Sequence, residues 1–180
     1  PVIFNVDKDF WRLVGVWVAE GDFNGYTIRF HNQNEEVRED IRRICNNYGL
    51  TFSEMKTCIT INSLFLQKVF SHVLGLQEGS KNKRLPAISF TIDEECKANL
   101  LKGYFSGDGT ISAKERGKFQ IEAGTISKEL ANDLMYLLLD FGIVATCYEK
   151  KERTGSITYR ISVLGVKNFE RFKGIGFIDS

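Results

Sequence analysis

The chain has 180 residues, of which 43% are hydrophobic and 12% aromatic, so it can bury a core and global disorder is excluded. The formal net charge is only +1, so binding of nucleic acid would require locally focused positive charge. Four widely spaced cysteines without a Cys-x-x-Cys pair, with only two histidines, argue against a zinc site and indicate free thiols in a reducing, intracellular compartment. No apolar run is long enough to span a membrane, and no signal peptide is recognisable.

The first half of the chain, residues 1–76, is expected to follow the order helix, two strands, helix, two strands, helix. Strand 26–31 alternates apolar Tyr26, Ile28 and Phe30 with polar residues, which predicts a half-buried strand. The other predicted elements are a helix that carries residues 13–20, strands at 51–55 and 57–62, and helices at 34–48 and 64–74 that end at Gly49 and Gly75.

A polar linker, residues 77–92, is expected to join this half to a second one, residues 93–180. The second half repeats the order, with strands at 110–113, 118–125, 144–150 and 157–164, a helix capped by Ser127, and a last helix at 166–173. The fold class is therefore α+β: a pseudo-twofold tandem repeat of helix-strand-strand-helix-strand-strand-helix. We expect the two halves to pack as one unit whose two antiparallel sheets form a saddle.

The segments 13–22 and 101–109 share one pattern, a mostly apolar helical stretch that ends in a carboxylate followed by glycine. The carboxylates are Glu20 and Asp108. Because the end of a helix carries partial negative charge, an acid at that position needs a compensating group. The repetition predicts two such acids held together.

Gly15 and Gly103 occupy the middle of these helices, where glycine costs roughly 1 kcal/mol relative to alanine. A helix tolerates that cost where another backbone approaches closely. We therefore expect the helices to cross at Gly15 and Gly103 and to bring Glu20 and Asp108 side by side. A hard divalent cation such as Mg²⁺ would offset the repulsion between the two carboxylates.

Both segments resemble the LAGLIDADG motif of homing endonucleases, and the single chain with two motifs resembles intein-encoded and archaeal intron-encoded members. Lys83-Arg84-Leu85-Pro86 resembles the Lys-Arg-Ile/Leu-Pro block that precedes the second motif in intein endonucleases. The resemblance covers almost the whole chain. It implies a monomeric, site-specific endonuclease that cuts double-stranded DNA at a long asymmetric site with Mg²⁺, or with Mn²⁺ in its place.

The resemblance also implies the roles of individual residues. Glu20 and Asp108 match the metal-binding acids, and Lys83 matches the catalytic lysine of the first half. The first acid is Glu rather than the commoner Asp, which keeps the charge and shifts the geometry slightly. The counterpart of Lys83 is expected several residues past Gly176, whereas the sequence ends at Ser180, so we expect unequal cleavage of the two strands.

The sequence begins at Pro1 without an initiator Met, which together with the Lys83-Arg84-Leu85-Pro86 block predicts a segment excised from a larger intein or intron-encoded protein.

The saddle is expected to face the major groove of DNA, where base pairs can be told apart. Strand alternation and the long turns of the second half assign residues to that face. The candidate DNA contacts are Thr27, Arg29, His31, Lys114, Arg116, Lys118, Gln120, Glu122, Lys150, Arg153, Thr158 and Arg160. Acidic residues are expected instead on the outer faces of the helices. The near-neutral net charge is therefore compatible with positive charge on the sheet face and negative charge on the helix face.

Other interpretations remain open from the sequence. The chain could be a non-cleaving relative on the same scaffold, either a DNA-binding module or an RNA-binding splicing helper of the maturase type. The presence of both Glu20 and Asp108 favours cleavage. Taken singly, the motif helices could be ordinary core helices, the strand residues a solvated sheet face, and Lys83 a solvated linker charge.

Overall fold

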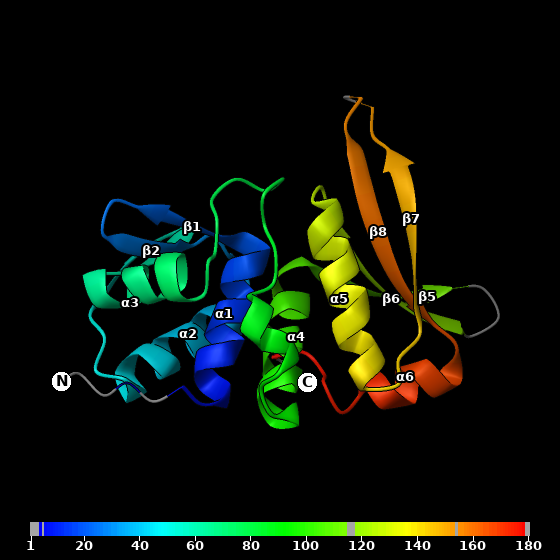
Figure 1. Cartoon of the computed structure of the whole chain (residues 1–180), viewed down its shortest axis with the longest axis horizontal. Coiled ribbons are helices and arrows are strands. Elements are labelled where there is room, and N and C mark those ends of the chain that lie inside the picture. Colours follow the sequence, from blue (N-terminus) through cyan, green and yellow to red (C-terminus); the bar gives the residue numbers. More distant parts are fainter. Residues whose placement is uncertain (1–3, 5, 115–117, 154, 179–180) are drawn as a thin grey trace.

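The computed structural model describes residues 4, 6–114, 118–153 and 155–178. It contains two four-stranded sheets, one in each half, on either side of two central helices (Figure 1). These helices are α1 (Lys8–Glu20) and α4 (Glu94–Asp108), the two motif helices. The predicted α+β fold with two antiparallel sheets is confirmed.

The first half follows the predicted order, and its strands lie in the sheet as β1-β2-β4-β3. After α1 it contains β1 (Gly21–Asn24), β2 (Thr27–Phe30), α2 (Glu35–Asn47), β3 (Phe52–Met55), β4 (Cys58–Ile61) and α3 (Leu64–Lys68).

Two features of the first half differ in detail from the sequence prediction. The helix expected at 64–74 is α-helical only to Lys68 and continues as a π-helical turn, η1 (Val69–Val73), in which the Leu74 amide donates to the Val69 carbonyl at 2.9 Å. Tyr26 lies in the turn between β1 and β2 and is 70% exposed, so the half-buried strand begins one residue later.

The second half repeats the same sheet order, β5-β6-β8-β7. A short 3₁₀ helix, η2 (Ala87–Phe90), precedes α4. The elements after α4 are β5 (Gly109–Lys114), β6 (Lys118–Thr125), α5 (Lys128–Asp140), β7 (Ala145–Lys151), β8 (Ile157–Leu164) and α6 (Val166–Phe172). Ser127 caps α5 as predicted, accepting the Leu130 amide at 3.1 Å.

Alternation along the strands separates an apolar face from a polar face in each sheet. In the first sheet Ile28 and Phe30 of β2 are fully buried, while Arg29 between them is partly exposed. In the second sheet Ile121 and Ile161 are buried in the same way. The apolar faces and the central helices form one hydrophobic cluster that includes residues of both halves.

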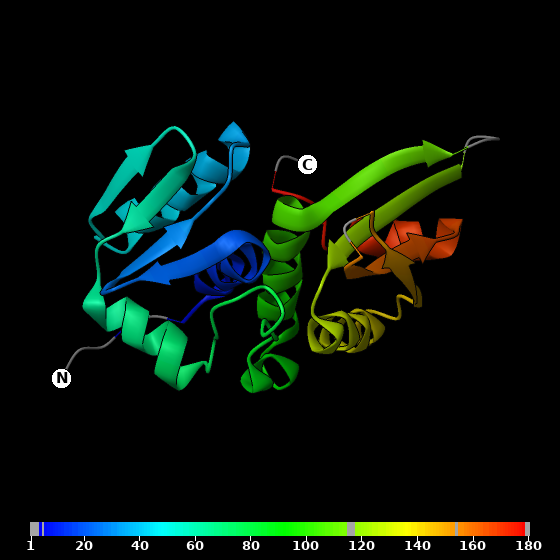
Figure 2. The same cartoon turned by 90° about the horizontal axis from the view of Figure 1, so that it is seen from above.

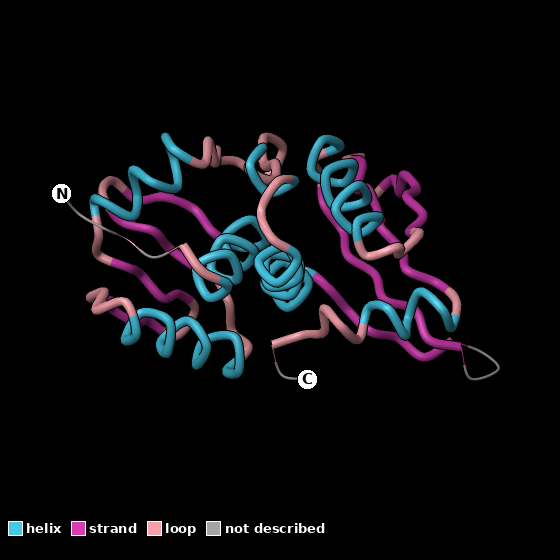
Figure 3. Tube along the Cα trace, turned by 60° about the horizontal axis from the view of Figure 1, so that its bottom comes forward, coloured by secondary structure: helices cyan, strands magenta, loops and turns pink. Residues whose placement is uncertain are grey.

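The two central helices lie between the strands of the two halves in the tube view (Figure 3). Seen from above, each sheet extends outward from this central pair (Figure 2). Among the described residues, none of the helices has both the length and the apolar character that a bilayer crossing requires. All four cysteines are free thiols; Cys45, Cys58 and Cys96 are buried and Cys147 is exposed.

Candidate active site and nucleic-acid interface

The two motif helices cross at their glycines. A Cβ atom at Gly15 would lie 2.1 Å from the carbonyl oxygen of Leu100 in α4, and one at Gly103 would lie 2.1 Å from that of Arg12 in α1. No side chain fits at either position without moving the opposite backbone. Close contact at the crossing brings the C-terminal ends of α1 and α4 together, as Figure 1 shows.

Glu20 and Asp108 occupy these two adjacent ends. A Cβ at Gly107, the residue before Asp108, would lie 2.6 Å from Ala19 Cβ and 3.6 Å from Glu20 Cγ. Each acid is the last residue of its helix and is followed directly by a strand, β1 or β5. The acids therefore lie where the helix pair meets both sheets.

Burial and mutual repulsion penalise the charged form of both carboxyl groups. Burial raises the pKa of Asp108 to about 7, the nearby Glu20 adds to the rise, and Lys83 opposes it. Burial also raises the pKa of Glu20, against the opposing effects of a hydrogen bond from the Asn32 amide and the charges of Lys83 and His31. Two such carboxylates have a strong electrostatic preference for a bound cation.

Lys83 lies at the same place and reaches the end of α1 from the linker. Its Nζ donates to the carbonyl oxygens of Trp17 at 3.2 Å and Ala19 at 3.0 Å, and it lies 5.3 Å from the centroid of the Trp17 ring. Burial lowers the Lys83 pKa to about 8, although the charges of Asp108, Asp22 and Glu20 all oppose this shift. A cation at the C-terminal end of α1 offsets the partial negative charge of the helix.

The second half holds the backbone of this block in place. Ser127 Oγ donates to the Lys83 carbonyl at 2.7 Å, which adds to its capping of α5. Asp133 of α5 accepts the Arg84 guanidinium at 3.0 and 3.2 Å and the Leu85 amide at 3.1 Å. The linker is thus anchored on one half while the Lys83 side chain contacts the other.

A hollow opens beside these groups, lined by residues of both halves. Lys83 and Asp108 face it together with Ala19, Ser80 and Thr158. The polar groups at the ends of the motif helices are therefore accessible to a ligand, although each side chain is largely covered by protein.

The donor set at this place fits a magnesium ion. Among the described residues, no group of three or more His, Cys, Asp or Glu side chains is arranged to hold a metal. Mg²⁺, however, commonly takes only one or two protein carboxylates and completes its shell with water and substrate phosphate oxygens. Glu20 and Asp108 would hold such an ion.

The register of the second sheet puts most of the candidate DNA-binding residues on one face. Glu122 lies opposite Ser162, and Lys150 lies opposite Thr158. Several of these side chains already have partners, because Gln120 donates to Ser162 Oγ at 2.7 Å and Glu122 accepts the Tyr148 hydroxyl at 2.8 Å.

Of the basic candidates that the structure describes in this sheet, Lys150 lies in the edge strand β7 and Arg160 in the inner strand β8. Both pair with Glu152 Oε1, which lies 3.6 Å from Arg160 Nη2 and 3.5 Å from Lys150 Nζ. Arg153 is exposed. Arg116 lies outside the described residues, and the side chains of Lys114 and Lys118 are outside them as well.

The polar face of the first sheet carries Thr27, Arg29 and His31. The Thr27 hydroxyl donates to the Asn24 carbonyl at 2.8 Å. Arg29 makes a two-bond pair with Asp22, Nε to Oδ1 and Nη2 to Oδ2, each at 2.7 Å. His31 Nε2 lies 3.2 Å from the same Asp22 Oδ2.

Asp22 and Asn32 are site residues that sequence reasoning missed. The signal for Asp22 was the register of the hairpin that follows Glu20, in which Asp22 pairs with Arg29. Locating that register required β1, whose residues have weak strand propensity.

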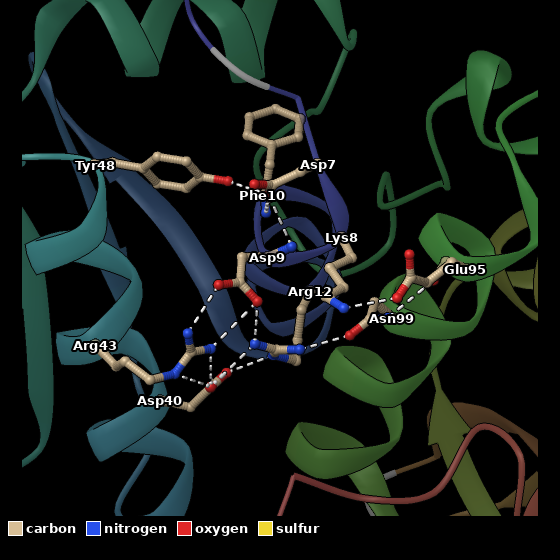
Figure 4. Close-up of polar contacts among 10 residues, drawn as sticks. All are labelled: Asp7, Lys8, Asp9, Phe10, Arg12, Asp40, Arg43, Tyr48, Glu95 and Asn99. Atoms are coloured by element: carbon tan, nitrogen blue, oxygen red, sulfur yellow. Dashed lines mark hydrogen bonds and ion pairs between the residues drawn. The ribbon is translucent and has the colours of Figure 1, made fainter.

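A second polar network, at the opposite end of α1, was also missed (Figure 4). Arg12 donates to Asp9 in its own helix, to Asp40 of α2 at 2.6 Å and to Asn99 of α4 at 2.5 Å. Arg43 of α2 joins the network through Asp9 at 2.8 Å. The network ties α1 to both neighbouring helices far from the acids.

A pseudo-twofold α+β fold, with two acids at the adjoining ends of crossing helices, defines the class of single-chain proteins with two LAGLIDADG motifs. Family models agree in both halves: residues 8–61 match the WhiA LAGLIDADG-like domain and residues 95–175 match the LAGLIDADG-like domain. The chain belongs to the LAGLIDADG family.

Curated relatives are long proteins of archaea. The chain is 35% identical, over 98% of its length, to an uncharacterized protein of Methanocaldococcus jannaschii, and 29% identical, over 88%, to a DNA polymerase of Thermococcus hydrothermalis. It spans only 21% and 9% of those two proteins.

Solved structures share the fold at low sequence identity. The structure of I-DmoI in complex with DNA and Mn matches with a TM-score of 0.66 at 14% identity, covering 98% of this chain and 99% of that chain. Full-length DUF199/WhiA from Thermatoga maritima matches with a TM-score of 0.68 at 18% identity, covering 97% and 58%.

Proposed function

We propose that the chain is a site-specific endonuclease that hydrolyses phosphodiesters in both strands of DNA at a long asymmetric site. The proposal rests on one observation above all: Glu20, Asp108 and Lys83 meet at the ends of two crossing helices, where both sheets begin. Two acids and one cation at this position suit a phosphodiester backbone laid across the two sheets.

The roles follow from the chemistry of these groups. Glu20 and Asp108 would hold Mg²⁺, or Mn²⁺ in its place, and such an ion would supply activation of water and charge stabilisation at the leaving oxygen. Lys83 keeps its ammonium beside the acids and offsets the negative charge that gathers around the phosphate. The Trp17 and Ala19 carbonyls fix its position, since they accept two of its three N–H groups.

The polar sheet faces would bind the duplex on either side of this centre. Thr27, Arg29 and His31 would contact one half-site, and Gln120, Glu122, Lys150, Thr158 and Arg160 the other, with Lys114, Arg116, Lys118 and Arg153 at its outer turns. The two halves present different side chains at equivalent positions, which agrees with an asymmetric site. We propose residues 1–76 and 93–180 as the two domains, joined by the linker 77–92.

The relatives support the same proposal. I-DmoI is described as a homing endonuclease, and its structures include complexes with DNA and Mn, Mg or Ca. The match within a small part of a Thermococcus DNA polymerase supports an origin as an excised intein segment.

A second candidate is a non-cleaving protein that binds DNA or RNA on this scaffold. It is favoured by the match of residues 8–61 to the WhiA LAGLIDADG-like domain. Retention of both carboxylates, together with the buried Lys83 beside them, favours cleavage over this alternative.

The test is cleavage selection from a library of randomised DNA in the presence of Mg²⁺. We expect the wild type to cut a subset of sites, and Asp108→Asn and Glu20→Gln to lower the rate by roughly a hundredfold or more. Asp140→Asn, which changes an exposed acid of α5, is the matched control and should cut normally. Binding without cleavage of any site would establish the second candidate instead.

A further inference from the structure

The pair formed by Arg29 and Asp22 on the first sheet has a geometry that the proposed chemistry does not use. Asp22 takes two N–H groups of the guanidinium, Nε–H and one on Nη2. A guanidinium has five N–H groups, so three remain, two on Nη1 and one on Nη2. Within the part of the chain that the structure describes, these three have no acceptor.

Two of the three free N–H groups, one on Nη1 and one on Nη2, form one edge of the planar guanidinium. Because Asp22 occupies the Nε–Nη2 edge, the guanidinium is fixed with its Nη1–Nη2 edge available. Two parallel donors of this kind match the O6 and N7 acceptors of guanine in the major groove. Preorganisation also reduces the side-chain entropy lost on binding.

The surroundings hold the pair in place without covering it. The side chains of Arg29 and Asp22 are 32% and 35% exposed, so the guanidinium is accessible from the polar face. His31 Nε2 lies 3.2 Å from Asp22 Oδ2, the oxygen that also accepts from Arg29 Nη2, and further restrains the carboxylate. Arg29 and Asp22 lie directly opposite each other in β2 and β1, which fixes the backbone on which the pair is built.

We infer that Arg29, positioned by Asp22, reads a guanine in the half-site that faces the first sheet. This inference rests on the proposed binding of DNA by the sheets. The strand ladder also locates the base: the His31 amide donates to the Glu20 carbonyl at 3.1 Å, and Arg29 is two residues earlier in β2. Two residues of strand span ~7 Å, the rise of about two base pairs. The guanine therefore lies close to the cleavage position.

The second half lacks this unit. By sheet register, Thr110 and Glu122 form the pair that corresponds to Asp22 and Arg29. Glu122 carries the opposite charge and accepts from the Tyr148 hydroxyl. A carboxylate accepts from cytosine rather than donating to guanine, so no guanine preference is expected at the corresponding position of the other half-site.

The experiment is selection of bound sites from randomised DNA, with every protein carrying Asp108→Asn so that binding is read without cleavage. We expect one position near the centre to prefer guanine by roughly 5- to 150-fold, the range of a two-bond contact. Arg29→Lys keeps the charge but not the fork that Asp22 positions. Because a lysine can still donate to guanine, this variant should reduce the preference, at that position alone. Asp22→Asn weakens the two-bond contact that positions Arg29 and should reduce the guanine preference at the same position.

Arg43→Lys is the matched control, because it disturbs an arginine–aspartate pair on the helix side and should leave every base preference intact. If Arg29→Lys weakens binding equally at all sequences and leaves the guanine preference unchanged, the proposed recognition of guanine by Arg29 would be overturned, while DNA binding by the sheets would stand. Absence of DNA binding by the parent protein would overturn both the readout and the sheet-face proposal. If the selected sites show the guanine preference but the protein with Asp108 intact cuts none of them in Mg²⁺, the endonuclease proposal alone would be overturned.

Discussion

At the scale of single residues, the buried carboxyl of Asp108 gives the metal-free protein an unusual dependence on pH. With a pKa of about 7 in the folded state against 3.8 in a model peptide, the folded chain holds the proton more tightly than the unfolded chain. Stability therefore falls as pH rises from about 4 to about 7, by ~1.4 kcal/mol for each unit of pKa difference.

Asp108→Asn removes the titrating group and keeps the shape of the side chain. In chelator, we expect this variant to be more stable than wild type by about 2–4 kcal/mol near pH 8, and the advantage to shrink to less than half near pH 5. Urea unfolding at the two pH values measures both differences. A variant less stable than wild type near pH 8 would mean that Lys83 stabilises the carboxylate more than burial and Glu20 penalise it.

The same scale shows which site residues the sequence could reveal. Glu20 and Asp108 stand out because an acid at the end of an apolar helix is electrostatically unfavourable and occurs twice. Asp22 and Asn32 carry no such signal, because each acts through a hydrogen-bond partner across a turn. Asp22 accepts from Arg29, and Asn32 donates to Glu20. Cross-strand partners need a register, and a single sequence specifies register only where both strands are evident.

At the scale of elements, the crossing of α1 and α4 depends on two glycines. Replacing Gly103 by Ala improves helix propensity by ~1 kcal/mol but puts a methyl group 2.1 Å from the carbonyl oxygen of Arg12. A backbone oxygen in a packed helix has no room to move, so overpacking should dominate.

We expect Gly103→Ala to destabilise the protein by about 1–3 kcal/mol and to lower cleavage, since separating the helices also separates the acids. Gly107→Ala in the same helix is the graded comparison, because its nearest neighbour is the Ala19 methyl group rather than a backbone atom. Equilibrium unfolding should rank wild type above Gly107→Ala, and Gly107→Ala above Gly103→Ala. The reverse order would show that the crossing is not the tight contact.

Helices were easier to predict than the strand β1 and the π-helical turn η1. Asn34 and Ser127 cap their helices by accepting backbone amides, and Gly49 and Gly142 follow their ends with φ of 64° and 65°. These are local signals that survive in a sequence. The strand β1 and the π-helical turn η1 depend instead on pairing and packing with distant segments, which leave no local pattern.

At the scale of the whole molecule, the halves are joined by more than the linker. One hydrophobic cluster contains residues of both sheets and both central helices. Arg12 ties α1 to α2 and α4 at one end of the helix pair, and the Lys83 block ties α5 to α1 at the other. Neither half keeps its core or its polar contacts when the other unfolds, so the two should lose structure together.

Urea unfolding followed by two probes tests this directly. Trp11 and Trp17 are both buried in α1, so tryptophan fluorescence reports the first half, whereas far-ultraviolet circular dichroism reports helices of both halves. We expect the two transitions to coincide. Arg12→Met leaves Asp40 and Asn99 without their partner. It should lower the free energy of unfolding by about 1–3 kcal/mol and move both transitions together to a lower urea concentration. A fluorescence transition that separates from the circular dichroism transition would instead mean that the halves are stable independently and that the helix crossing is a docking contact between them.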